Sequence, residues 1–326
     1  MHQAQSKPIG LALFGDQGHQ IHKECLQNKY PDTRLIGFAG FKPGNEAALK
    51  AAGIPAYSNL QALLALDQVD LVCFCSARRD IQGEHILEAL EAGKHVYAEK
   101  PCCLSETVLD AIISTAQRKK LRFHEMNASS FSQPYNTLRE IVKSGQLGEI
   151  VQIFCQKSYP WGEWRPKDER IDGGLARQVG IYNLRFAEQV AGLKITDLQI
   201  KETRLGNPNP DSDCRRAVSM LMEFENGAVG SAVANYSCPP PEDWGHWGYE
   251  TVRIFGTNGF VESIDRGRIG TLAVRGEASQ TLDFSGDSAD YLQMFLEEIK
   301  SGQDRIPLSL EEELNPTRWL LRAKKL

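Results

Sequence analysis

The first 125 residues alternate short apolar runs with segments of helical periodicity, and this alternation constrains the fold more than any other feature. The apolar runs are 9–14, 33–40, 69–75, 94–99 and 121–125. Helical patterns separate them, most clearly at 83–93 and 105–120. Runs that are apolar throughout and alternate with helices indicate parallel strands covered on both faces. The sequence therefore predicts a doubly wound α/β domain over residues 1–125.

The pattern changes after residue 125. Polar and apolar residues alternate at 149–158, which is typical of a half-exposed strand. Asn226-Gly227 and Asn258-Gly259 each stand between apolar runs, and this dipeptide is a strong hairpin signal. We therefore predict a second, α+β domain over 126–326 with a mostly antiparallel sheet. Its helices are expected at 134–144, near 175–191, and at 288–301 and 310–324.

Composition excludes several classes of function. A chain of 326 residues with a net charge of -5 is not built mainly to bind nucleic acid or anionic lipid. No apolar stretch approaches the roughly 20 residues that span a bilayer, and the N-terminal residues lack a secretory pattern, so we expect a cytoplasmic protein. The 8 cysteines form no CxxC pair, and we expect neither disulfides nor a metal site.

The string LFGDQG at 13–18 follows the first strand. Gly15 and Gly18 match the second and third glycines of a GxGxxG dinucleotide-binding turn, which allow backbone approach to a pyrophosphate and close packing of helix on strand. Leu13 replaces the first glycine, so we expect the loop to follow a different path. Asp16 also brings a negative charge to a place that would otherwise attract phosphate.

The second strand ends without the acidic residue that usually holds the ribose hydroxyls of NAD. Gly40, Phe41 and Lys42 stand there instead. Lys42 can meet a 2′-phosphate, which would favour NADP, or it can be a solvated lysine in a turn. Both interpretations remain open, and we expect NADP(H) to bind at least as well as NAD(H).

Two longer strings carry a family resemblance. EAGKHVYAEKP at 91–101 and GGLARQVGIYNLRFAEQVAG at 173–192 resemble signatures of the glucose–fructose oxidoreductase/inositol dehydrogenase (Gfo/Idh/MocA) family, and 69–85, 138–150 and 254–260 also match its habits. The resemblance implies an N-terminal Rossmann domain, a C-terminal domain on an open antiparallel sheet, NAD or NADP as cofactor, and a homodimer or homotetramer formed through that sheet.

The resemblance also implies roles for particular residues. In the family the EKP lysine, here Lys100, lies between nicotinamide and substrate, where an ammonium can stabilise an alkoxide as hydride moves. The alternative is an exposed loop lysine. We assign the cofactor to residues of the strand ends: Phe14, Gly15, Gln17, Gly18, Lys42, Ser76, Glu99 and Lys100.

The string at 173–192 resembles the family's catalytic helix, whose commonest form is DxGxHxxD. The corresponding residues here are Gln178, Gly180, Tyr182 and Arg185. Some members carry tyrosine in the histidine position, so Tyr182 is our general acid/base candidate, with a buried core tyrosine as the alternative. An adjacent ammonium group would lower its pKa, and Lys100 is the expected neighbour.

The same helix offers substrate contacts. Spacings of four and three place Gln178, Tyr182 and Arg185 on one face of an α-helix. Arg185 suits a substrate carboxylate, or it can pair with Glu188. Trp161 and Trp164 lie in a Pro/Gly-rich loop and suit either stacking on a sugar ring or subunit contacts.

These observations predict an NAD(P)-dependent oxidoreductase acting on a secondary alcohol or ketone of a sugar, polyol or related ring. Two alternatives are kept. The altered residues Leu13, Gly40, Gln178 and Arg185 suit a catalytically silent sensor or regulator. An enzyme that retains its cofactor for internal redox is the other.

Overall fold

The computed structural model describes residues 7–162 and 165–325, which form two compact units. Unit 1 comprises Met1–Met126, Arg170–Asp172 and Tyr291–Leu314. Unit 2 comprises Asn127–Glu169, Gly173–Asp290 and Asn315–Leu326. The chain therefore returns to unit 1 twice, briefly at Arg170–Asp172 and then, after most of the residues of unit 2, at Tyr291–Leu314.

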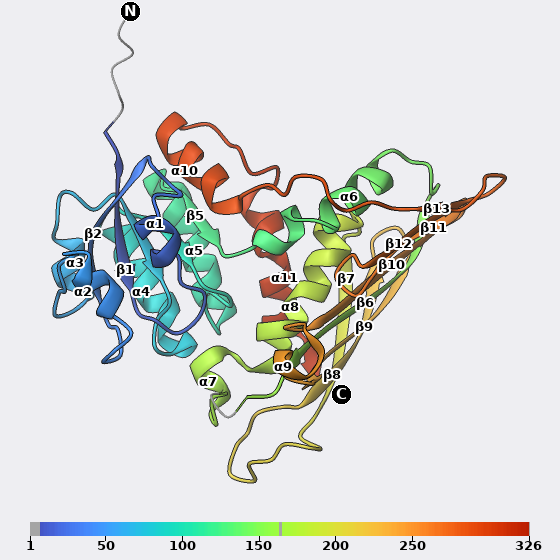
Figure 1. The fold of residues 1–326 in the computed structure, drawn as a ribbon, viewed down its shortest axis with the longest axis horizontal. Coiled ribbons are helices and arrows are strands. Elements are labelled where there is room, and N and C mark those ends of the chain that lie inside the picture. The colour runs from blue at the N-terminus through green and yellow to red at the C-terminus, as the bar shows by residue number, and fades with distance from the viewer. Residues whose placement is uncertain (1–6, 163–164, 326) are drawn as a thin grey trace, which may run out of the picture. The chain divides into compact units, whose positions relative to one another are not determined.

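Unit 1 is built on a five-stranded sheet whose strands are all parallel (Figure 1). The order is β2-β1-β3-β4-β5, with β1 at Ile9–Phe14, β2 at Thr33–Ala39, β3 at Leu71–Phe74, β4 at His95–Ala98 and β5 at Phe123–Glu125. β3 is buried at every position, as expected for a strand covered on both faces. The doubly wound fold class is confirmed.

The helices of unit 1 alternate with these strands. They are α1 (His22–Leu26), α2 (Ala47–Ala51), α3 (Leu60–Leu64), α4 (Arg79–Glu91) and α5 (Glu106–Lys119), followed much later by α10 (Tyr291–Ser301) and the start of α11 (Leu310–Arg322). Gly93 follows α4 with φ +80°, the left-handed conformation expected at a helix C-terminus. Ser105 stands at the N-cap of α5, but its side chain makes no capping hydrogen bond.

Unit 2 is built on a nine-stranded sheet in the order β13-β12-β11-β10-β6-β9-β8-β7-β14. The strands are β6 (Ile150–Pro160), β7 (Ile195–Thr203), β8 (Ala217–Phe224), β9 (Val229–Cys238), β10 (Tyr249–Gly256), β11 (Gly259–Ile264), β12 (Ile269–Val274), β13 (Gln280–Thr281) and β14 (Lys324–Lys325). Both predicted Asn-Gly hairpins form, joining β8 to β9 and β10 to β11. The β6–β9 and β7–β14 pairs are parallel and the remaining pairs are antiparallel, so the mostly antiparallel sheet is confirmed.

The helical segments of unit 2 include α6 (Tyr135–Lys143) and α8 (Ile181–Arg185), which pack against one face of this sheet (Figure 1). α8 continues on both sides into π-helical turns, η2 (Ala176–Gly180) and η3 (Phe186–Val190). Shorter elements are η1 (Ala128–Phe131) and α9 (Pro241–Trp244) in unit 2, and α7 (Glu169–Asp172), of which Arg170–Asp172 belong to unit 1. The core lies between the helices and the sheet and includes Tyr135 and Tyr182.

Across residues 7–162 and 165–325, no helix combines the length and the apolar character needed to cross a bilayer.

Candidate active site

The turn after β1 begins later than the glycine pattern predicts. Leu13 lies within β1, is 3% exposed and pairs with Phe38 of β2 and Cys73 of β3. Because the strand continues through Phe14, the chain turns at Gly15, where φ is +80°. Leu13 therefore fills the core of the sheet, and the expected change in the loop's path is explained.

Gly15 and Gly18 are needed for close packing. A Cβ atom on Gly15 would lie 2.2 Å from the carbonyl oxygen of Cys75, and one on Gly18 would lie 2.6 Å from the Glu99 carboxylate. Gly18 also has a φ of +134°. The loop is thus pressed against the carboxyl ends of β3 and β4, the edge at which open α/β sheets bind ligands.

Two backbone amides of this loop donate hydrogen bonds within the part of the chain that the structure describes, and two others do not. Those of Gly15 and Gln17 donate to the carbonyl oxygens of Ala39 and Cys75, both at 2.9 Å. The amides of Asp16 and Gly18 donate to no residue that the structure describes. Two such donors suit a pyrophosphate, so the loop fits a dinucleotide cofactor.

Asp16 and Lys42 meet at the same loop. One oxygen of Asp16, Oδ2, accepts from the Lys42 amide at 2.8 Å and from Asn45 Nδ2 at 2.7 Å. The other oxygen, Oδ1, is buried without a hydrogen-bond partner. Lys42 Nζ donates to Gln17 Oε1 at 3.2 Å. The carboxylate and the ammonium therefore both lie beside the end of β2, where ribose recognition is expected.

Arg79 ties three of the strand-end loops together. Its side chain is 1% exposed, and its guanidinium donates to Ser76 O at 2.8 Å, to Lys100 O at 3.4 Å and to Gln17 O. These carbonyls follow β3, β4 and β1. Arg79 could not be found from the sequence, because two of its three carbonyl partners, Gln17 and Lys100, are distant in the chain.

Glu99 and Lys100 follow β4 and are both buried, at 1% and 4% exposed. The Glu99 carboxylate accepts from His19 N at 2.5 Å, His19 Nδ1 at 2.7 Å and Lys100 N at 2.9 Å. Burial disfavours its charged form, but His19, Lys100 and Arg79 together hold the pKa of Glu99 well below its usual range. Lys100 Nζ lies 4.0 Å from Glu99 Oε1, so the ammonium lies beside a fixed carboxylate.

Two other predicted cofactor residues are placed at the same edge. Ser76 is fully buried, and its Oγ lies 3.0 Å from His85 Nδ1. Phe14 packs edge-on against Phe74 and His85. The structure thus brings all the predicted cofactor residues to the carboxyl end of one sheet, while their contacts with a cofactor stay a prediction.

In unit 2 the predicted catalytic helix forms, but it is not α-helical throughout. Gln178 lies in the π-helical turn η2, whereas Tyr182 and Arg185 lie in α8. A π-turn winds more residues per turn than an α-helix, so Gln178 is offset from the α-helical register that the spacing assumed. Such turns are frequent at functional sites. Gln178 is half-buried, Tyr182 is 8% exposed and Arg185 is fully buried.

Tyr182 faces a buried lysine that the sequence analysis did not select. Lys157 of β6 is 3% exposed, and its Nζ lies 3.9 Å from the centre of the Tyr182 ring. The same ammonium lies 5.2 Å from the centre of the Tyr159 ring. A cation over an aromatic face is attracted by the ring's quadrupole.

Glu250 of β10 completes this cluster. It stands directly opposite Lys157 in the β6–β10 register, and its carboxylate accepts from Lys157 Nζ and from Tyr135 Oη of α6. The alternation of inward and outward positions along the strands could have identified both charged residues. Lys157 follows Ile153 and Cys155 at the inward positions of β6, and Glu250 precedes Val252 and Ile254 at those of β10.

The structure describes only some of the residues predicted to contact substrate. Trp161 is half-buried, with its ring 6.0 Å from that of Tyr236 and with the Arg216 guanidinium 4.8 Å above it. Trp164 lies outside the described residues. Glu188, the alternative partner of Arg185, accepts from Ile195 N at 3.2 Å and Asn315 Nδ2 at 2.6 Å.

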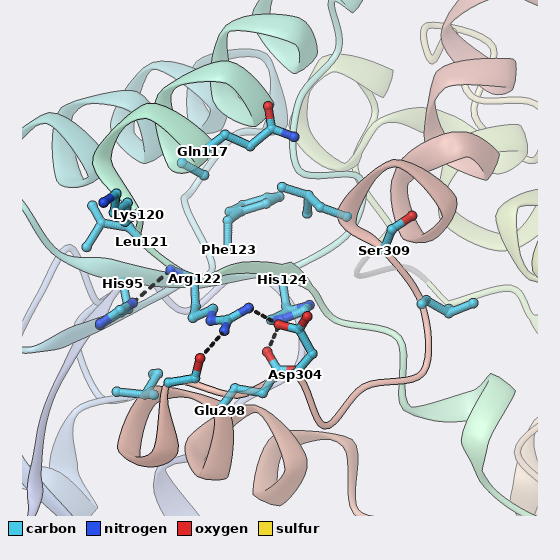
Figure 2. A pocket seen from close by; sticks show the side chains of 15 residues that line it. His95, Gln117, Lys120, Leu121, Arg122, Phe123, His124, Glu298, Asp304 and Ser309 are labelled. Atoms are coloured by element: carbon cyan, nitrogen blue, oxygen red, sulfur yellow. Dashed lines mark hydrogen bonds and ion pairs between the residues drawn. The ribbon is translucent and has the colours of Figure 1, made fainter.

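A cavity of about 570 Å³ lies elsewhere in unit 1 (Figure 2). It is lined by residues at the amino ends of β4 and β5, including His95 and Arg122, and by Glu298 and Asp304 of the C-terminal segment. No residue predicted to bind cofactor or substrate lines it. The cavity is therefore separate from the ligand-binding edge at the carboxyl ends of the strands.

Comparison with known families agrees with this arrangement. Residues 9–126 match the model of the "Oxidoreductase family, NAD-binding Rossmann fold", and residues 135–262 match the "GFO/IDH/MocA C-terminal domain". The chain belongs to the GFO/IDH/MocA family. As a member of it, the chain is an oxidoreductase whose first unit is an NAD-binding Rossmann domain.

Individual GFO/IDH/MocA relatives are distant. The chain is 22% identical to the scyllo-inositol 2-dehydrogenase (NAD(+)) of Bacillus subtilis over 96% of this chain and 91% of that protein. It is 31% identical to the D-glucoside 3-dehydrogenase of Escherichia coli over 57% and 55%. A solved inositol dehydrogenase homolog from Azotobacter vinelandii, complexed with NADH and myo-inositol, has a TM-score of 0.77 at 17% identity and coverage of 98% and 95%. That likeness shows the fold.

Proposed function

We propose that this protein transfers a hydride between NAD(P) and a secondary alcohol or ketone of a sugar, polyol or related ring. The observation that carries the proposal is the buried Lys100, fixed beside Glu99 at the carboxyl end of β4 next to the glycine loop. The names of the relatives support the substrate class, because they are dehydrogenases of inositols and a glucoside.

The residues divide the chemistry as follows. The amides of Asp16 and Gly18 would hold the pyrophosphate of the dinucleotide, and its nicotinamide would supply the hydride acceptor. In the oxidation direction the substrate carbon loses a hydride while Tyr182 Oη takes the hydroxyl proton. Lys100 Nζ stabilises the negative charge that develops on the substrate oxygen. Gln178 and Trp161 would contact the remainder of the ring.

The test removes each reacting group without disturbing the fold. Lys100→Ala and Tyr182→Phe are each expected to lower turnover by about a hundredfold or more. Circular dichroism spectra that match wild type provide the control. Nearly full activity of Tyr182→Phe with an unchanged pH dependence would show that another group transfers the proton.

Arg185 extends the proposed substrate class to acidic sugars, because a guanidinium binds a carboxylate through two parallel hydrogen bonds. The side chain is fully buried, so Arg185→Ala is assayed only after its folding has been checked. Neutral sugars and their uronates are compared in wild type and variant. Equal use of both classes by both proteins would end the proposal that Arg185 binds a substrate carboxylate.

Cofactor choice is set at the loop where Asp16 and Lys42 meet. Lys42→Ala is expected to weaken NADP(H) binding and to leave NAD(H) binding unchanged, because its ammonium would meet only the 2′-phosphate. Asp16→Ala is expected to strengthen NADP(H) binding, because its carboxylate repels that phosphate. Calorimetric titration measures both. NAD(H) binding tenfold tighter than NADP(H) in wild type, about 1.4 kcal/mol, would contradict our expectation for Lys42.

A silent sensor or regulator is the second candidate, favoured by the replacements at Leu13, Gly40, Gln178 and Arg185. Absorbance and mass spectra of the purified protein separate the functions. Retained cofactor supports internal redox, saturable binding of added cofactor supports the dehydrogenase, and no binding supports the regulator.

The remaining expectations concern assembly and location. We propose a homodimer or homotetramer formed through the sheet of unit 2, on which Leu221 and Val229 are 59% and 49% exposed. Exposed apolar side chains gathered on one face mark interaction surfaces. We also propose a cytoplasmic location, for which fractionation of cells is the measurement.

A further inference from the structure

Lys157 is a charged group in a position where the alternation of β6 calls for an apolar one. Its neighbours of the same parity, Ile153 and Cys155, are fully buried. A lysine that is 3% exposed requires compensation, which Glu250 provides from the adjacent strand. The cluster therefore holds the ammonium in one place.

Glu250 is itself fixed as a carboxylate. It accepts from Tyr135 as well as from Lys157, and Arg266 Nε lies 3.7 Å from its Oε1. Burial opposes ionisation, but Lys157, Tyr135 and Arg266 hold the pKa of Glu250 below its usual value. One side of the ammonium is thus occupied by a permanent negative charge.

The ammonium also lies close to two aromatic rings. Tyr182 lies 3.9 Å away and Tyr159 lies 5.2 Å away, measured to the ring centres. The two rings are 6.4 Å apart at 80°, and their side chains are hydrogen-bonded. Burial raises the pKa of Tyr159, so Tyr159 remains a neutral hydrogen-bonding partner. The charged groups that act on the Tyr159 hydroxyl include Glu250, Arg266 and Arg165, and the Lys157 ammonium lies near both rings.

We propose that Lys157, held by Glu250 and Tyr135, is a positioning residue that stabilises the phenolate form of Tyr182 and so prepares it to accept a proton. The inference rests on the proposed role of Tyr182. Deprotonation places a negative charge on the ring that the ammonium already faces, in surroundings that screen the attraction far less than water does. This assigns to Lys157 the influence that the sequence analysis expected from Lys100.

The experiment measures the titration of Tyr182 directly, with neither substrate nor cofactor present. The full chain is titrated by phenolate absorbance in paired samples with and without Tyr182→Phe, so that the difference isolates this one side chain. Lys157→Met is expected to raise the pKa of Tyr182 by at least one unit, a tenfold change in its ionisation constant. Lys194→Met, at an exposed lysine that pairs with Glu225, is the matched control and is expected to change nothing.

A second variant reverses the sign. Glu250→Gln removes the negative charge and leaves the ammonium, so the pKa of Tyr182 is expected to fall below that of wild type. This variant also keeps the proposal testable if Lys157→Met does not fold. A group that serves only packing would not shift the titration in opposite directions in the two variants. An unchanged pKa of Tyr182 in either folded variant would overturn the inference.

Failure of the proposed function gives a different result. If Tyr182→Phe keeps its activity and pH profile, Tyr182 is not the proton-transfer group, whatever the titration shows. If Tyr182→Phe is inactive but the titration is unmoved by Lys157→Met, the proposed function stands and the role of Lys157 is wrong. If Tyr182 transfers the proton and Lys157 lowers its pKa, then Lys157→Met is expected to shift the pH profile of kcat/KM by the same amount as it shifts the titration of Tyr182.

Discussion

Each unit of the molecule buries a cluster of charge, and the two clusters are built differently. In unit 1 His124 of β5 lies between two carboxylates, with Nδ1 2.5 Å from Glu313 and Nε2 2.8 Å from Glu298. In unit 2 Lys157 pairs with one carboxylate and lies near two aromatic rings. Both clusters are almost fully buried, yet only the second faces a group proposed to move a proton.

The first cluster fastens the fold. Both carboxylates hold backbone amides as well as the imidazole: Glu313 accepts from Glu125 N, and Glu298 accepts from Arg305 N and Ile306 N. Burial would lower the pKa of His124, but Glu313 and Glu298 raise it to about 9. The cluster therefore joins α10 and the start of α11 to β5 with every charge directed at another. A buried charge whose partners also hold the backbone stabilises the fold, whereas one that lies over a titratable ring changes the chemistry of that ring.

The largest effect is expected from His124→Ala. Removing the imidazolium leaves two buried carboxylates facing each other, so the free energy of unfolding is expected to fall by about 3–5 kcal/mol. Lys157→Met is expected to cost about half as much, on the order of 2 kcal/mol, because Arg266 and Tyr135 still contact Glu250. Urea denaturation of both variants at pH 7 measures the difference. Equal losses in the free energy of unfolding would show that the two clusters contribute equally to stability.

The pH dependence of stability is expected to follow His124. Its pKa is raised in the folded state, so its contribution is complete below pH 6.5 and is lost as the pH rises through about 9. The loss is on the order of 3 kcal/mol. Glu298 acts in the opposite sense: its pKa is held at about 2, so its contribution is present above pH 4.5 and is lost towards pH 2. Urea titrations between pH 6 and pH 10 should show the fall in wild type and not in His124→Ala.

The smallest effect is expected from Glu188→Gln in unit 2. Glu188 is held by neutral donors, and burial raises its pKa to about 7. A raised carboxyl pKa makes stability fall as the pH rises from 4.5 through 7, because the folded protein binds the extra proton. Glu188→Gln should therefore be more stable than wild type at pH 8 by about 1–2 kcal/mol and little different at pH 5. A variant that is less stable at pH 8 would show that Glu188 is ionised and paired.

The sequence predicted the five strands of the unit 1 sheet, β6 and the two Asn-Gly hairpins of unit 2, and the position of the cofactor loop, because those features depend on local periodicity and on glycine. The position of Lys100 at the end of β4 follows from the same pattern. Arg79 could not be found in this way, since its carbonyl partners follow three separate strands. The sequence also did not predict β7, β12, β13 or β14.

The predicted catalytic helix also has a feature that the local sequence does not reveal. Its existence was evident, but its π-turns were not, because they depend on packing. Gly180 closes the first of these turns, and a Cβ atom there would lie 2.2 Å from Met220 Cε of β8. Lys157 and Glu250 stand out from the alternation along their strands, yet identifying them as partners required the register of β6 with β10.

The return of the chain to unit 1 at Tyr291–Leu314 has a consequence for how the protein is made on the ribosome. His124 emerges early, but Glu298 and Glu313 follow only after nearly all of unit 2 has been synthesised. At about 5–20 residues per second, the nascent β5 waits roughly ten seconds or more for its partners. During that interval the imidazole is an uncharged group on an uncovered edge strand. The first domain to leave the ribosome is therefore not complete until Leu314, close to the end of synthesis, and chaperones have long access to it.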